Sequence, residues 1–79
     1  MTVLAEVAAA ETALRALGFR QLRVRHYGDL ARLELPIEDL QSVLDRRDEI
    51  VAAVRRAGYR YVTLDLEGFR SGNLNAALG

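Results

Sequence analysis

The sequence of 79 residues contains no cysteine, no lysine and no tryptophan, and only one proline and one histidine. Without cysteine, the chain cannot form disulfides, thiolate metal sites or thiol nucleophiles. The one histidine, His26, cannot make a histidine-based metal site alone, so no metal site is expected. All eleven basic residues are arginine, and eleven acidic residues balance them to a net charge of zero. This balance argues against nucleic acid as a partner.

Long apolar runs are also missing, although 51% of the residues are hydrophobic. No run approaches the roughly 18 residues that a membrane span needs, so no membrane insertion is expected. The N-terminal stretch MTVLAEVAAAE carries two glutamates and no basic segment, unlike a secretion signal, and we expect a cytoplasmic location. The length predicts a single domain over residues 1–79, with residues 70–79 as a tail.

Hydrophobic periodicity predicts the secondary structure. Apolar residues recur at helical spacing over residues 3–17, with Thr2 as the cap and Gly18 after the end. Apolar and polar residues then alternate in two runs, 19–27 and 30–36, which predicts a hairpin around Gly28 and Asp29.

The second half of the chain predicts two more helical segments and a strand. Pro36 ends the hairpin and opens a short helical turn, IEDLQSVL. Asp45 is the expected cap of the helix RRDEIVAAVRRA, which carries acids near its start and arginines near its end, as the helix dipole favours. Residues 59–67 alternate again and predict a third strand, with Leu66 on its apolar side and Glu67 on its polar side.

One unit occurs twice in the sequence. ALRALGFRQLRVRHYG (13–28) and AVRRAGYRYVTLDLEG (53–68) align without a gap at an offset of 40 residues, with five identical positions. Two helix–glycine–aromatic–arginine–strand units predict a small α/β (α+β) fold, a two-layer sandwich with helices on one sheet face. The order α-β-β-α-α-β resembles a ferredoxin-like split βαβ that lacks its first strand.

Charged residues gather on the strand face that the helices leave bare. They are Arg23, Arg25, Arg32, Glu34, Asp65 and Glu67. One interpretation is a wetted face of cross-strand ion pairs, each contributing about 0.2–1 kcal/mol. The other is that carboxylates hold the arginines in register to bind a phosphate or carboxylate ligand. Spacing alone leaves both open.

The remaining polar and aromatic residues favour structural roles. His26 falls on the apolar side of its strand and is expected to be structural. We expect the aromatic residues Tyr27, Tyr59, Tyr61 and Phe69 to be packing residues. The loop RSGN after Phe69 is either an anion-binding backbone nest or the start of the tail. Glycine-rich phosphate loops and an interpretable Ser/His/Asp set are missing, so no catalytic residue is assigned.

Two spaced motifs, GFRQLRVRHYGDLARLE and YVTLDLEGFRSGNLN, closely resemble the C-terminal end of the ATP-dependent sacrificial sulfur transferases, the LarE family of PP-loop ATP pyrophosphatases. The resemblance covers roughly residues 6–75. It implies an enzyme with a PP-loop catalytic domain that uses ATP and Mg, activates a pyridinium dicarboxylate mononucleotide and takes sulfur from a protein cysteine. The product feeds nickel-pincer cofactor biosynthesis.

This chain lacks both the SGGxDS phosphate loop and the cysteine of that family. The resemblance therefore implies a C-terminal domain, as a fragment or split subunit, that is inactive alone and needs no cofactor of its own. It carries a substrate-binding role to Arg23, Arg25, Asp65 and Arg70. It also implies a PP-loop catalytic domain as partner, and a homo-oligomer. The alternative is a free-standing oligomerisation module or a small anion-binding module without catalytic activity.

Overall fold

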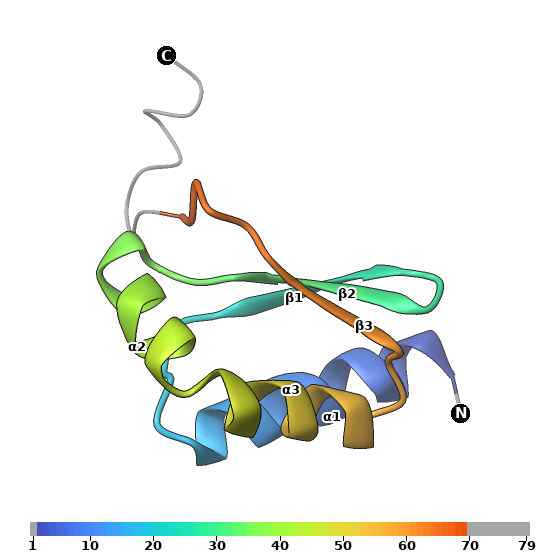
Figure 1. Ribbon diagram of the computed structural model, residues 1–79. Coiled ribbons are helices and arrows are strands. Elements are labelled where there is room, and N and C mark those ends of the chain that lie inside the picture. The colour runs from blue at the N-terminus through green and yellow to red at the C-terminus, as the bar shows by residue number, and fades with distance from the viewer. Residues whose placement is uncertain (1, 70–79) are drawn as a thin grey trace.

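The computed structural model describes residues 2–69, and its element order α-β-β-α-α-β is the predicted one. The elements are α1 (Val3–Ala16), β1 (Arg23–Tyr27), β2 (Leu30–Glu34), the 3₁₀ helix η1 (Ile37–Asp39), α2 (Leu40–Asp45), α3 (Arg47–Arg56) and β3 (Tyr61–Leu64). They form two layers, with α1 and α3 side by side beneath one face of the sheet (Figure 1). The predicted α+β sandwich is confirmed.

The sheet has three strands in the order β1-β2-β3 and is mixed. β1 and β2 pair antiparallel through the expected hairpin, with Val24 opposite Leu33. β2 and β3 pair parallel, with Leu33 opposite Leu64. Because parallel neighbours need a crossover connection, α2 and α3 link these two strands beneath the sheet. β2 therefore lies between β1 and β3, the strands of the two repeated units. The two units contact each other through their helices, α1 and α3.

The repeated sequence unit gives a repeated local structure. Leu14 and Val54, at equivalent positions near the ends of α1 and α3, are both fully buried. The aromatic residues that follow, Phe19 and Tyr59, are also buried, at 5% and 2% exposure. Each donates its backbone N–H to the carbonyl five residues earlier, at 3.3 Å for Phe19 and 3.4 Å for Tyr59. Both helices therefore end in the same way and send the chain back towards the sheet.

The core lies between the sheet and the two long helices and is apolar throughout. Its fully buried side chains with the largest volumes are Leu14, Leu33, Leu35, Ile50 and Val54. No polar or charged residue of the described range 2–69 is buried. Apart from the Tyr59 phenol, the ionisable groups of this range consequently lie at or near the surface, where they can meet a ligand or a partner.

The third strand is shorter than predicted. It ends at Leu64, and residues 65–68 form a turn in which the Gly68 N–H donates to the Asp65 carbonyl at 3.0 Å. Asp65 Oδ1 also accepts the Glu67 N–H at 3.0 Å, because an aspartate side chain competes with the sheet for backbone donors. The placement of Leu66 on the apolar side is wrong, since Leu66 is 74% exposed in this turn.

The expected cap of α3 is also wrong. Asp45 is the last residue of α2, and Arg46 occupies the N-cap position of α3 without a side-chain cap. Because α2 runs on through Asp45, that carboxylate accepts from Gln41 Nε2 at 3.0 Å instead. Arg46 donates to the Leu17 carbonyl at 2.7 Å and joins the end of α1 to the start of α3.

Candidate functional site

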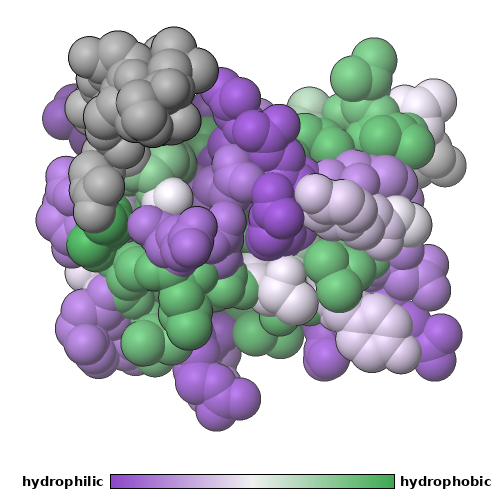
Figure 2. All heavy atoms as spheres, turned by 90° about the horizontal axis from the view of Figure 1, so that it is seen from above, coloured by the Kyte–Doolittle hydropathy of each residue, from purple (hydrophilic) through white to green (hydrophobic). Residues whose placement is uncertain are grey.

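The candidate site is the open face of the sheet, the side opposite the helices. Alternation along three strands and their register place nine residues there in three rows. The rows are Tyr27, Leu30 and Tyr61 at the hairpin end, then Arg25, Arg32 and Thr63, then Arg23, Glu34 and Asp65, the last directly after β3. Seen from above, hydrophilic side chains gather over the middle of the sheet (Figure 2). The predicted gathering of arginines and carboxylates on the bare face is confirmed for five of its six residues, and it is wrong for Glu67, which lies in the turn after β3.

Glu34 is the centre of an ion-pair network on the open face. Its Oε1 accepts from Arg25 Nε at 3.1 Å, and its Oε2 accepts from Arg32 Nη2 at 2.7 Å. Arg32 Nε extends the network to Asp65 Oδ2, at 3.9 Å. One carboxylate on the central strand therefore fixes an arginine on its own strand and an arginine on β1.

Arg32 has a structural role in this network. The hydrogen bond to Glu34 raises the pKa of Arg32 above its usual value, and burial of the guanidinium opposes this rise. Its Nε is enclosed and has no hydrogen-bond partner within residues 2–69, since 3.9 Å to Asp65 is too long for one. The same guanidinium lies over the Tyr27 ring, 5.3 Å from its centre. Arg32 is thus held from several sides and supports the surface around it.

Arg23 and Arg25 are the arginines with donors available to a ligand. Arg25 bonds Glu34 only through Nε, its side chain is 45% exposed, and its terminal nitrogens make no side-chain hydrogen bond within the described residues. Arg23 is exposed and has no ion-pair partner within the described residues. Two residues apart on β1, they point the same way about 7 Å apart. Such a pair of guanidinium forks fits a ligand with two anionic groups.

The other two predicted site residues are Asp65 and Arg70, and the structure describes only Asp65. Asp65 lies beside Arg32 at the edge of the open face, and its second oxygen holds the turn after β3. Arg70 lies outside the described residues. The structure therefore brings Arg23, Arg25 and Asp65 onto one face, with Glu34 and Arg32 between them. The sequence placed Glu34 on this face, but its central position follows from strand register, which local spacing does not give.

Two aromatic residues that we expected to pack are exposed. Tyr27 and Tyr61 are 55% and 54% exposed and flank Leu30 in the row at the hairpin end. The packing prediction is wrong for these two because they share the strand parity of the open face. It is confirmed for Tyr59, which is 2% exposed.

His26 takes the structural role that the sequence predicts. Its Nδ1 lies 2.8 Å from the Tyr59 hydroxyl and 3.9 Å from Glu6 Oε1, on the helix side of the sheet. Burial raises the pKa of Tyr59, and the nearby carboxylates of Glu6 and Glu11 add to the rise. This cluster joins β1, α1 and the connection between α3 and β3, away from the open face.

The chain's own residues do not fit ATP or a magnesium ion. The sequence has no glycine-rich phosphate loop, and within residues 2–69 no three histidine, aspartate or glutamate side chains group as metal ligands would. In the same described range, every helix is too short or too polar to cross a lipid bilayer. What the open face can do chemically is bind and orient an anion.

The fold and the open face define a small α+β domain with an arginine–carboxylate surface, homologous to one part of larger proteins. The chain is 48% identical over 75 residues, 95% of its length, to pyridinium-3,5-bisthiocarboxylic acid mononucleotide synthase of Lactiplantibacillus plantarum. It is 47% identical over 77 residues to an uncharacterised protein of Synechocystis sp.. The chain spans 27% and 29% of the lengths of these relatives. No family model matches the chain. The resemblance that the two motifs indicated is thereby confirmed as sequence similarity.

Proposed function

We propose that this chain is the C-terminal domain, as a fragment or split subunit, of an ATP-dependent sacrificial sulfur transferase of the LarE family in nickel-pincer cofactor biosynthesis. The observation that carries this proposal is 48% identity to a synthase of which the chain spans about a quarter. A PP-loop catalytic domain, in the same gene or a separate subunit, supplies the ATP loop and the cysteine that this chain lacks. The chain contributes the open face and subunit contacts in the cytoplasm.

The role of the open face in this proposal is to bind and orient the substrate. The synthase is named for a mononucleotide with two thiocarboxylic acid groups, and the phosphate and acid groups of such a molecule are anionic. Arg23 and Arg25 donate to these groups, because guanidinium forks pair with phosphate and carboxylate in two-pronged geometry. Glu34 holds Arg25 in position through the 3.1 Å bond to Nε. Asp65 lies at the edge of the same face, where the chain leaves β3, and Arg70 is a further proposed donor to the ligand.

The ligand part of the proposal is tested with nicotinic acid mononucleotide, which carries one phosphate and one carboxylate. Calorimetric titration of the chain should show binding that Arg23→Ala and Arg25→Ala each weaken by roughly tenfold or more, since a charged hydrogen bond contributes about 1.5–3 kcal/mol. Arg15→Ala removes an exposed arginine from α1 on the opposite layer and should leave the affinity unchanged. Equal affinity of all four proteins would reject the arginine site.

The assignment to a larger enzyme has a separate test. The coding DNA upstream of Met1, or an adjacent gene, should encode an SGGxDS loop and a cysteine. Finding neither would favour the alternative, a free-standing oligomerisation or anion-binding module. One observation favours that alternative: residues 2–69 enclose an apolar core of their own.

A further inference from the structure

The hairpin end of the open face carries two exposed tyrosines beside the arginines. Strand register sets Tyr27 opposite Leu30 and Leu30 opposite Tyr61, so these three residues form one row across the sheet, the tyrosine row. Seen from above, weakly polar and apolar side chains lie beside the hydrophilic ones at this end (Figure 2). Both tyrosines are more than half exposed, and neither hydroxyl makes a side-chain hydrogen bond within residues 2–69. Core packing therefore does not account for the two rings.

The tyrosine row has the spacing to receive one flat ring. Neighbouring strands lie about 4.8 Å apart, so a ring above the half-buried Leu30 lies about 5 Å from each flanking strand. Aromatic rings contact each other with their centres about 4.5–7 Å apart. Sheet faces that bind bases do so through exposed aromatic side chains, because every base presents a flat π face. Leu30 supplies an apolar floor beneath such a ring.

Both tyrosine rings already accept a positive charge. The guanidinium carbon of Arg32 lies 5.3 Å from the centre of the Tyr27 ring, and that of Arg60 lies 5.8 Å from the centre of the Tyr61 ring. The face of an aromatic ring is negative and attracts a cation within about 6 Å. Repulsion between Arg32 and a second cation is offset by Glu34, which accepts from Arg32 at 2.7 Å. The row therefore favours a ring that is both flat and positively charged.

The tyrosine row also continues the line of arginines. Along β1, Arg23, Arg25 and Tyr27 point the same way, each about 7 Å from the next. In a mononucleotide the ribose separates the phosphate from the base. One molecule laid along β1 consequently meets a guanidinium with its phosphate and a tyrosine with its ring.

We propose that the tyrosine row binds the pyridinium ring of a mononucleotide whose anionic groups Arg23 and Arg25 bind. The inference rests on the proposed function, since the related synthase is named for a pyridinium mononucleotide. It adds the part of the site that recognises the ring. The tyrosines determine specificity for a flat cationic ring, whereas the arginines supply the attraction for phosphate and carboxylate.

Two ligands test the preference for a cationic ring. Nicotinic acid mononucleotide has a pyridinium ring, and orotidine monophosphate carries a phosphate and a carboxylate on a neutral flat ring. In calorimetric titration of the 79-residue chain, nicotinic acid mononucleotide should bind roughly fivefold or more tightly than orotidine monophosphate. The reason is that each exposed contact between a cation and an aromatic face contributes about two- to fivefold in affinity.

Tyr61→Leu is the most direct variant, because Tyr61 lies outside the ion-pair network of Glu34. This change keeps an apolar side chain and removes the π face, so it should weaken nicotinic acid mononucleotide roughly fivefold or more. Ribose 5-phosphate, which has no base, should bind the variant and the wild type within about twofold of each other. Tyr61→Phe retains the π face and should restore the affinity. Arg60→Ala is the control for the neighbouring cation and should not weaken binding.

Four results would overturn the proposal. They are equal affinities of the wild type for the two mononucleotides, no effect of Tyr61→Leu, a loss in Arg60→Ala as large as that in Tyr61→Leu, and tighter binding of a single-stranded oligonucleotide that Tyr61→Leu abolishes. The last result would assign the row to nucleic acid. If Arg23→Ala still weakens both mononucleotides while Tyr61→Leu has no effect, the arginine site of the proposed function stands and the tyrosine row alone is rejected.

Discussion

At the scale of single residues, Glu34 organises the open face. It lies on the central strand, its side chain is only 13% exposed, and it accepts hydrogen bonds from one arginine on its own strand and one on β1. A carboxylate in this position offsets the repulsion between the neighbouring arginines and holds both of them through charge-assisted hydrogen bonds. Arg25 keeps its terminal N–H donors for a ligand, because it bonds Glu34 through Nε.

Replacing Glu34 by glutamine should lower the free energy of unfolding by about 1–2 kcal/mol, since two charge-assisted hydrogen bonds lose their ionic partner. Urea denaturation of the variant measures this change. Glu38→Gln is the control, because Glu38 is exposed on η1 and lies off the open face. If Glu34→Gln lowers the free energy of unfolding no more than the control does, the ion-pair network does not stabilise the fold.

Tyr59 should make stability depend on alkaline pH. Burial raises its pKa above the usual value, so the folded state favours the protonated phenol. The stabilisation is fully present below about pH 10, the pKa in the unfolded chain, and is lost as the pH rises through the higher folded pKa. Tyr59→Phe should flatten the fall in unfolding midpoint between about pH 9 and 11.5, although it costs about 1 kcal/mol at neutral pH through the lost bond to His26.

The matched control for this titration is Tyr61→Phe, whose ring is 54% exposed. This variant should retain the alkaline fall of the wild type. If both variants lose the fall equally, the buried phenol is not its cause.

At the scale of elements, the sequence predicts every helix and strand in order. The physical reason is that apolar residues recur at the period of a helix or of a strand. Apolar spacing is set by the burial of one face, so it survives in the sequence wherever an element contacts the core. The errors at Asp45 and at Leu66 both lie at element ends. There the outcome depends on which single donor an aspartate side chain reaches, and hydrophobic period carries no information on that choice.

The turn after β3 gives a prediction at this scale, through two glycines at equivalent repeat positions. Gly28 and Gly68 have φ of +57° and +65°, and alanine there costs about 1–2 kcal/mol for the left-handed backbone. A Cβ on Gly68 would also lie 2.8 Å from the Leu35 carbonyl oxygen, a backbone atom, whereas one on Gly28 meets nothing within 4 Å. Gly68→Ala should therefore be more destabilising than Gly28→Ala by at least about 1 kcal/mol.

Thermal or urea unfolding of the two glycine variants measures the difference directly. Both variants share the backbone effect, so the comparison isolates the close approach of the turn to β2. Equal destabilisation would mean that the turn can move away from the Leu35 carbonyl at no cost in the free energy of unfolding.

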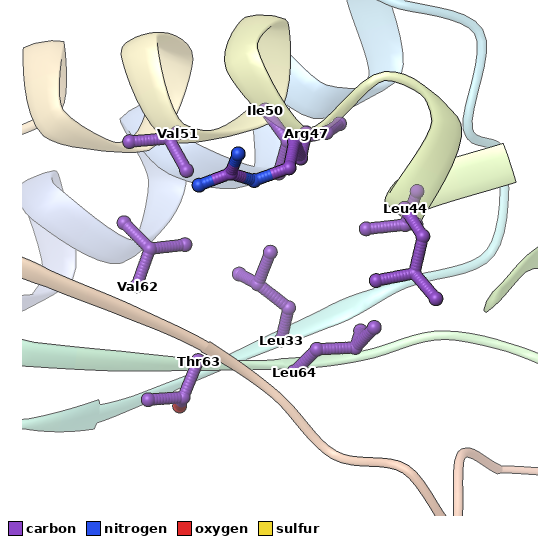
Figure 3. Close-up of a pocket in the computed structure, with 9 residues that line it drawn as sticks. Leu33, Leu44, Arg47, Ile50, Val51, Val62, Thr63 and Leu64 are labelled. Carbon is purple, nitrogen blue, oxygen red and sulfur yellow. The ribbon is translucent and has the colours of Figure 1, made fainter. Parts of the chain in front are cut away.

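At the scale of the whole molecule, the one layer of helices within residues 2–69 leaves one face and one edge of the sheet without a cover from that range. The bare face carries the arginine–carboxylate network, and the edge at β3 adjoins an apolar groove lined by Val62 and Leu64 of β3 and Val51 of α3 (Figures 2 and 3). Strand parity alone predicted which arginines share the face. The edge could not be predicted in this way, because it depends on β2 lying between the strands of the two repeated units, a long-range pairing that local patterns do not encode.

The partial length of the chain relative to its relatives fits this asymmetry. The chain spans 27% and 29% of the lengths of its relatives, so the matched region in those proteins adjoins further residues. We propose the exposed arginines of the open face as the surface that binds a small anion.

The central claim is that Arg23 and Arg25 on the open face bind the anionic groups of a mononucleotide. The most direct measurement is NMR of the arginine Nε–Hε signals during titration of the 79-residue chain with nicotinic acid mononucleotide. We predict shifts that saturate together for Arg23 and Arg25, with smaller changes at Arg32 and none at Arg55 on α3. Shifts at Arg55 or Arg47 with unchanged signals from Arg23 and Arg25 would contradict the claim.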